Sequence, residues 1–192
     1  MSQSSVISDV SRTLQMLLET KLAPDKTIKV TVTSPKTVKL VKEHQLNLYL
    51  CQVVENPFVK NREPIRVGYD RLRQPPLALN LYYLLTPYIK NEEDNRDEHL
   101  LLGQAMRILY EHSILTDPFL EGELKGSGEE IKIVLCSMNL EELTRIWNSL
   151  QMSYRLSVYY EVRVLLVDST REWEVHRVAT KETLYHQLKS SV

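Results

Sequence analysis

The chain has 192 residues, of which 43% are hydrophobic and 26% are charged. This composition predicts a globular protein and excludes disorder along the whole chain, because enough apolar side chain is present to form a core. The 24 basic and 25 acidic residues nearly cancel, which argues against a generally basic nucleic-acid binder.

The near-neutral total conceals two halves of opposite charge. Residues 1–80 contain 12 basic and 7 acidic side chains, whereas residues 81–192 contain 12 basic and 18 acidic side chains. The local net charges are therefore +5 and −6. This asymmetry has two interpretations. The simpler one is that the surface loops of the two halves differ in charge, and the other is that one chain carries two complementary surfaces.

Signals for export, membrane insertion and disulfide formation are missing from the sequence pattern. The first residues lack a basic segment followed by an apolar one, so we expect synthesis in the cytoplasm without a signal peptide. No apolar run approaches the ~20 residues that span a bilayer, so we expect no membrane partner. Cys51 and Cys136 have neither zinc nor redox spacing, and we expect both thiols to be free.

The N-terminal quarter of the chain predicts one helix and two strands. Residues 5–22 repeat apolar side chains with helical spacing, and residues 27–33 are rich in β-branched side chains, which favours a strand. Residues 45–55 alternate, with Leu46 and Leu48 on one face, and this period of two also predicts a strand.

An arginine-rich segment separates this region from the next strand. Residues 58–75 contain four arginines without a regular apolar period, so we predict an irregular loop there. Residues 77–88 have apolar side chains at alternate positions and a mixed opposite face. That pattern predicts a central strand covered on one side by helices.

The second half of the chain predicts helices that alternate with strands. One helix opens with Asn139 and has Glu142 three residues later, the pattern of a capping box. In the strand predicted for residues 154–168, the even-numbered positions are apolar and the opposite face carries charged side chains. We therefore expect this strand to be half exposed or to face another subunit. The predicted helices cover residues 98–112 and 139–150, and the predicted strands cover residues 131–135 and 154–168.

The order of these elements predicts an α+β fold. We expect a mixed, mostly antiparallel sheet with helices packed on one face. We expect a single domain over residues 1–169, followed by a C-terminal arm at residues 170–192.

Motifs for catalysis and cofactor binding are missing from the sequence, so we expect no enzyme, cofactor or metal site. It has no glycine-rich phosphate loop, zinc-protease motif or hydrolase elbow, and the five histidines lack metal-ligand spacing. One alternative is a small hydrolase that uses Glu98 and His99 as an acid/base pair. Two arguments disfavour this pair. Adjacent helix positions do not face each other, and a carboxylate at the start of a helix stabilises the helix by interacting with its dipole.

A second alternative is a nucleic-acid-binding adaptor. The basic stretch from Lys26 to Lys42 could contact phosphates, but it contains no aromatic residue on which bases could stack. A solvated or protein-facing basic surface suits the near-neutral total charge better, so we expect no nucleic-acid partner.

Several blocks in fixed order resemble a known family. They are Leu46-Asn47-Leu48-Tyr49-Leu50; Glu55-Asn56-Pro57 with Asn61; Pro75-Pro76-Leu77-Ala78-Leu79-Asn80-Leu81-Tyr82-Tyr83-Leu84-Leu85-Thr86; Glu98-His99-Leu100-Leu101-Leu102-Gly103 with Ala105-Met106; His112 with Ile114-Leu115; Glu141-Glu142-Leu143 with Trp147; and Tyr154-Arg155-Leu156-Ser157 with Val167-Asp168-Ser169. Together they resemble the cap, or tail-terminator, proteins of phage-tail-like contractile injection particles. The resemblance covers residues 5–169.

This resemblance implies a structural function and no catalytic residues. Such caps form a ring, with six members in contractile phages, that ends the inner tube and the sheath. The implied partners are further copies of the chain in a homohexamer, the inner tube protein and the sheath protein. The implied location is a particle that can be released from the cell.

The charge asymmetry suggests where subunits of such a ring meet. A cyclic oligomer joins two different patches of each subunit, and complementary potentials steer such docking. We predict contacts with subunits or partners at charged residues and one tryptophan. These are Lys36, Lys39, Arg71, Arg73, Glu92, Glu93, Asp94, Glu129, Glu130, Arg155, Arg163 and Trp173.

Overall fold

The computed structural model describes residues 5–22, 28–39, 44–90 and 95–175. The chain divides into two compact units: one comprises Met1–Asn61 and Pro76–Asp168, and the other comprises Arg62–Pro75 and Ser169–Val192. Within the described ranges, no helix has the length and apolar character needed to cross a membrane.

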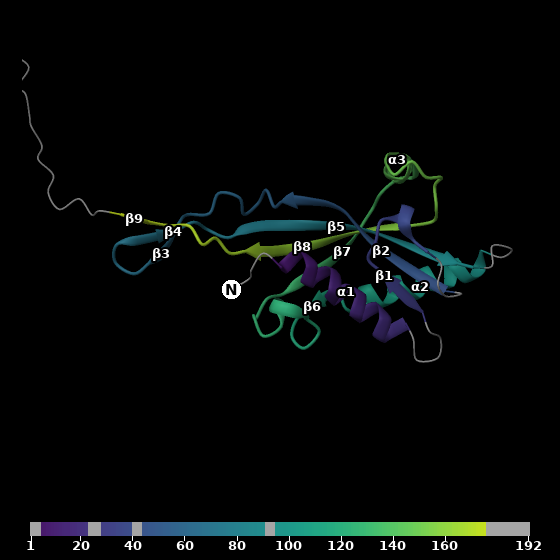
Figure 1. The fold of residues 1–192 in the computed structure, drawn as a ribbon, viewed down its shortest axis with the longest axis horizontal. Helices are drawn as coiled ribbons and strands as arrows, with labels where there is room; N and C mark the ends of the chain where they lie inside the picture. The colour runs from purple at the N-terminus through teal and green to yellow at the C-terminus, as the bar shows by residue number, and fades with distance from the viewer. Residues whose placement is uncertain (1–4, 23–27, 40–43, 91–94, 176–192) are drawn as a thin grey trace, which may run out of the picture. The chain divides into compact units, whose positions relative to one another are not determined.

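A six-stranded sheet forms the centre of the first unit (Figure 1). Its strands, in spatial order, are β1 (Lys29–Thr31), β2 (His44–Glu55), β5 (Leu77–Ile89), β8 (Val158–Val167), β7 (Ile131–Cys136) and β6 (Ile114–Leu115). β1 runs parallel to β2, and the other neighbouring pairs are antiparallel. The predicted α+β fold with a mixed, mostly antiparallel sheet is confirmed.

Two helices, α1 (Val6–Leu22) and α2 (Arg96–Glu111), cover one face of this sheet and form the main core with it (Figure 1). The predicted alternation of β2 is confirmed, because Leu46 and Leu48 both point into this core. Tyr83 of β5 is fully buried there, and its hydroxyl lies 2.8 Å from Ser11 Oγ of α1. Burial raises the pKa of Tyr83 to about 12, so its hydroxyl stays neutral in the core.

The third helix, α3 (Leu140–Ser149), packs on the opposite face (Figure 1). The prediction that all helices share one face is therefore wrong. The physical reason is that the second face of β5 and β8 is also apolar near Leu84 and Tyr159, and α3 covers them with fully buried Trp147. The predicted capping box is confirmed: Asn139 Oδ1 accepts from the Glu142 amide at 2.9 Å, and the Glu142 carboxylate accepts from the Asn139 amide at 2.8 Å.

A bulge changes which side chains of β8 face the core. Leu81 pairs with Val162 and Leu79 with Leu165, so β8 holds one more residue than β5 between these pairs. Leu165 is consequently buried, where a continuous alternation would have predicted Leu166. β8 also begins at Val158 instead of residue 154, because residues 154–157 leave the ladder.

The second unit contains a three-stranded antiparallel sheet. Its strands are β3 (Ile65–Val67), β4 (Arg71–Arg73) and β9 (Glu172–Glu174), with β4 in the middle. The prediction of an irregular loop over residues 58–75 is wrong for β3 and β4. These strands are short and have no buried face, so they lack the apolar period by which a strand is recognised, and their third strand lies about a hundred residues away in sequence.

Two short 3-10 helices, η1 (Pro35–Thr37) and η2 (Gly122–Leu124), complete the first unit. Buried Asp9 of α1 fixes η2, because its Oδ2 accepts from the Glu123 amide at 3.2 Å. Gly122 has φ +64°, and a Cβ at this position would lie 2.2 Å from Asp9 Oδ1. Both the conformation and the close approach therefore require glycine at this turn.

We predict that Trp147→Ala destabilises the first unit by about 4 kcal/mol, because it leaves a cavity under α3 and removes the donor to Ser157 Oγ. The free energy of unfolding in urea measures the loss. Leu140→Ala, on the same helix but 64% exposed, is the matched control and should change stability by less than about 0.5 kcal/mol. Equal losses for the two variants would contradict the assignment of α3 to this face.

Candidate functional site

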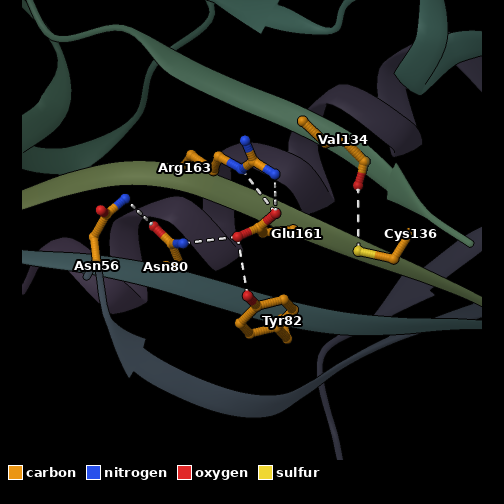
Figure 2. Close-up of polar contacts among 7 residues, drawn as sticks. All are labelled: Asn56, Asn80, Tyr82, Val134, Cys136, Glu161 and Arg163. Carbon is orange, nitrogen blue, oxygen red and sulfur yellow. Dashed lines mark hydrogen bonds and ion pairs between the residues drawn. The ribbon is translucent and has the colours of Figure 1, made fainter. Parts of the chain in front are cut away.

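A carboxylate, Glu161 of β8, lies at the centre of a buried polar network on the α3 side of the sheet (Figure 2). Its Oε1 accepts hydrogen bonds from Asn80 Nδ2 at 2.7 Å and from the Tyr82 hydroxyl at 2.9 Å. Its Oε2 accepts from Arg163 Nε at 2.7 Å. With only 7% of its surface exposed, Glu161 has its negative charge balanced by neighbouring side chains instead of by water.

The strand register explains why these residues meet. Tyr82 and Glu161 are direct partners across β5 and β8, and Arg163 follows two residues later on the same side of β8. The hydrogen bond to Glu161 raises the pKa of Arg163, which therefore stays charged. Burial, followed by the contact with Glu161, raises the pKa of Tyr82, which therefore stays protonated and keeps donating.

The two thiols near this face, those of Cys51 and Cys136, are not activated as nucleophiles. Burial raises the pKa of Cys51 to about 12. Burial, followed by the charge of Glu161, raises the pKa of Cys136, whose Sγ lies 3.9 Å from the carbonyl oxygen of Val134 (Figure 2). Nucleophilic cysteines need a lowered pKa, so these thiols are packing groups.

The network continues from Asn80 to the turn that follows β2. Asn80 Oδ1 accepts from Asn56 Nδ2 at 3.0 Å, and the Asn56 amide donates to the carbonyl oxygen of Ala78 at 2.8 Å. The side-chain oxygen of Asn56 accepts from the amide of Phe58 at 2.9 Å. Asn56 is 4% exposed, whereas Phe58 is 93% exposed. A fixed turn therefore presents an aromatic side chain to solvent.

A second charged contact ties residues 154–157 to α2. Arg155 Nη2 lies 3.1 Å from Glu98 Oε1, and the Arg155 guanidinium lies 4.7 Å from the centre of the Tyr88 ring. Glu98 therefore stabilises the fold through Arg155, and His99 is exposed on the helix. The structure does not bring Glu98 and His99 together as an acid/base pair.

The predicted interface residues of the first unit are mostly at its surface. Lys36 and Lys39 are exposed in and after η1, and Lys36 Nζ donates to Gln151 Oε1 at 3.1 Å. Glu129 and Glu130 directly precede β7, and Glu130 forms an ion pair with Lys132 at 3.2 Å. The predicted residues Glu92, Glu93 and Asp94 lie outside the described residues, as do Lys26 and Lys42.

The predicted interface residues of the second unit lie on two paired strands. Arg73 Nη2 forms an ion pair with Glu172 at 2.6 Å, and Arg71 is opposite Glu174 in the register. Trp173 is opposite Leu72 and is 37% exposed. The charge of Arg73 is therefore partly balanced by its own chain.

Sequence reasoning missed the exposed turn at Phe58 and the burial of Glu161. A signal for the first was present, since an Asn-Pro pair commonly opens a turn. Nothing in the sequence marked Glu161 as buried, because alternation assigned it to a solvated face. Within the part of the chain that the structure describes, no group of three His, Cys, Asp or Glu side chains could hold a metal ion.

We predict that Glu161→Leu destabilises the first unit by about 2 kcal/mol, because Asn80 and Tyr82 lose their buried acceptor. Glu161→Gln, which keeps an acceptor, should lose about 1 kcal/mol. Urea unfolding measures both values. The control is Glu141→Gln, which alters an exposed helix ion pair and should have an effect below about 0.5 kcal/mol. A Glu161→Leu variant with the same free energy of unfolding as the wild type would refute the structural role of the network.

Solved structures of cap proteins have the same fold. A PVC sheath/tube terminator of an extracellular contractile injection system, in the extended state, matches with a TM-score of 0.65 and 19% identity over 100% of this chain and 67% of that chain. The tube-terminating cap of the anti-feeding prophage matches with a TM-score of 0.62 and 17% identity over 96% of this chain and 62% of that one. This chain thus spans about two thirds of the length of either cap.

A comparison with curated proteins found no match. The family model described as the Pvc16 N-terminal domain matches residues 9–181, which is most of the chain. The resemblance to cap and tail-terminator proteins noted in the sequence is confirmed by this match together with the shared fold. The chain belongs to the Pvc16 N-terminal domain family.

Proposed function

We propose that this protein is a structural cap that ends the inner tube and the sheath of a contractile injection particle as a homo-oligomeric, six-membered ring. Family membership supports this proposal, as does the fold shared with a sheath/tube terminator and a tube-terminating cap. The proposed partners are further copies of the chain, the tube protein and the sheath protein. In this proposal the protein acts as part of a particle that leaves the cell.

The observation that carries the proposal is the turn at Phe58. The buried Asn56 side chain holds the turn through hydrogen bonds to Asn80 and to the Phe58 amide, yet Phe58 itself is 93% exposed. An aromatic side chain on a rigid backbone loses little conformational entropy when it binds, and such residues commonly anchor protein interfaces. This feature suits assembly better than chemistry.

Neither alternative function has a comparable observation in its favour. For a hydrolase, the Glu98 carboxylate is engaged by Arg155, 3.1 Å away. For a nucleic-acid adaptor, Lys29, Lys36 and Lys39 are exposed, but no aromatic residue accompanies them in the basic stretch. We therefore propose a protein without catalytic activity.

The native mass of the purified chain tests the proposal. We expect a species of six subunits by light scattering and ring-shaped particles in negative stain, either alone or after addition of tube protein as template. We also expect tubes assembled with the chain to be shorter than tubes assembled without it, because a bound ring blocks further growth. Unchanged tube length, together with a strict monomer in both conditions, would contradict the proposal.

We predict that Phe58→Ala lowers the affinity of the chain for its assembly partners about tenfold or more, as expected for an exposed aromatic anchor. Co-sedimentation with tubes and sheaths, and the native mass, measure the effect. The free energy of unfolding should stay within about 0.5 kcal/mol of the wild type, because Phe58 contributes little to the core. Lys60→Ala, an exposed change in the same turn, is the control. Wild-type assembly by Phe58→Ala would exclude Phe58 as an anchor.

A further inference from the structure

The two edges of the six-stranded sheet differ in how they are covered. At the β1 edge, side chains of α1 complete the hydrogen bonds of the strand. Glu19 Oε1 accepts from the Val30 amide at 3.2 Å, and Gln15 Nε2 donates to the Val30 carbonyl oxygen at 2.8 Å. At Val30 this edge is therefore closed to strand addition, and there it can meet a partner only through side chains.

At the opposite edge, part of β7 is open. β6 pairs with β7 only at Ile131 and Lys132, and the Ile133 amide donates to the carbonyl oxygen of Ser113 at 2.7 Å. Outward-directed backbone groups recur at every second residue, so those of Leu135 are next along this edge. Within the described ranges no strand pairs with that side of Leu135, whose side chain is 49% exposed.

An apolar groove lies beside the open part of β7. It has a volume of about 310 Å³ and runs between the C-terminal half of α2 and strands β7 and β8. Its apolar lining includes Met106, Leu109, Tyr110, Ile133, Leu135 and Tyr160. Among the described residues of the lining, the one charged residue is Arg107, which forms an ion pair with Glu111 at 3.8 Å. An apolar groove next to an open strand edge is a common docking site for a protein segment.

The two edges also carry opposite charge. Residues 28–39, which contain β1 and η1, have three lysines and no acidic residue. Residues 111–132, which surround β6, η2 and the start of β7, have six acidic residues and two lysines. Lys29 and Lys39 form no ion pair among the described residues, so their charges are available to a partner.

We propose that the β7 edge and its groove bind the β1 edge, residues 28–39, of a second copy of this chain. This inference rests on the proposed ring and specifies how its subunits join. Charge complementarity between the two edges identifies the occupant, because each copy carries one basic and one acidic edge. Half-buried Val32 and Val38 of the basic edge supply apolar contacts for the groove. Joining two different edges is a heterologous contact, the type that closes into a ring.

Charge reversal tests this interface. The variant K36E/K39E changes the net charge of residues 28–39 from +3 to −1, so both of its edges are acidic. The variant E129K/E130K changes the net charge of residues 111–132 from −4 to 0 and places two cations where the basic edge of the next copy docks. We expect each variant alone to raise the dissociation constant of the ring at least about tenfold, because like charges then face each other. Moderate salt should also raise the dissociation constant of the wild-type ring, because it screens the attraction between the two edges.

An equimolar mixture of the two variants distinguishes pairing of the two edges from general damage. The two variants can then alternate around an even-numbered ring, with the new acidic groups at positions 36 and 39 facing the new basic groups at positions 129 and 130. We therefore expect the mixture to assemble at concentrations at which neither variant assembles alone. A chain with all four substitutions should recover assembly to within about threefold of the wild type. Retained urea stability shows that each variant is folded.

Two further variants complete the test. Leu135→Asp should block assembly by placing a charge in the groove, whereas E141K/R145E, which reverses exposed charges on α3, should leave the ring unchanged. A wild-type ring that tolerates both charge reversals and Leu135→Asp would overturn the interface and leave the proposed cap function standing. A wild-type chain that forms no ring with or without tubes would instead contradict the proposed function, and the interface with it.

Discussion

The double-sided burial of β5 is the constraint on which the structure depends. This strand pairs with β2 on one side and β8 on the other, and neither of its faces is available to solvent over most of its length. Leu81, Tyr83 and Leu85 are buried under α1 and α2, while Leu84 is buried under α3. Because both faces must be covered, the chain needs helices on both sides, and the short α3 is positioned chiefly through Trp147.

Asn80 and Tyr82 of β5 find a hydrogen-bond acceptor inside the sheet, in the Glu161 network, whereas the buried hydroxyls of Thr86 and Tyr88 on the same strand have no hydrogen-bond partner among the described residues. Asn80 and Tyr82 lie on the α3 side of β5, and a carboxylate from β8 accepts hydrogen bonds from both. Asn80 in turn bonds Asn56, so the interior of the sheet sets the backbone of a surface turn. The hydrogen bonds of Asn56 therefore fix the backbone at the exposed Phe58, although the Phe58 side chain itself is hardly packed against the protein.

The sequence predicted the parts of the fold in which one periodic pattern decides the outcome. The alternation in β2 and the capping box at Asn139 could be predicted correctly, because each depends only on residues that are close together in the sequence. The bulge in β8, the face chosen by α3 and the pairing of β4 with β9 depend on distant partners, which a local pattern does not contain. Of the predicted contact residues, Lys36, Lys39, Glu129 and Glu130 are solvent-accessible and stay predictions. Arg155, Arg163 and Arg73 bind acids of their own chain, which charge patterning alone did not indicate.

The raised thiol pKa values of Cys51 and Cys136 have a consequence for chemical durability. Oxidation of cysteine proceeds through the thiolate, and burial keeps both groups protonated at neutral pH. The two residues are on β2 and β7, with β5 and β8 between them, so they are too far apart to form a disulfide within the sheet. We therefore expect both thiols to oxidise more slowly than an exposed cysteine with an ordinary pKa.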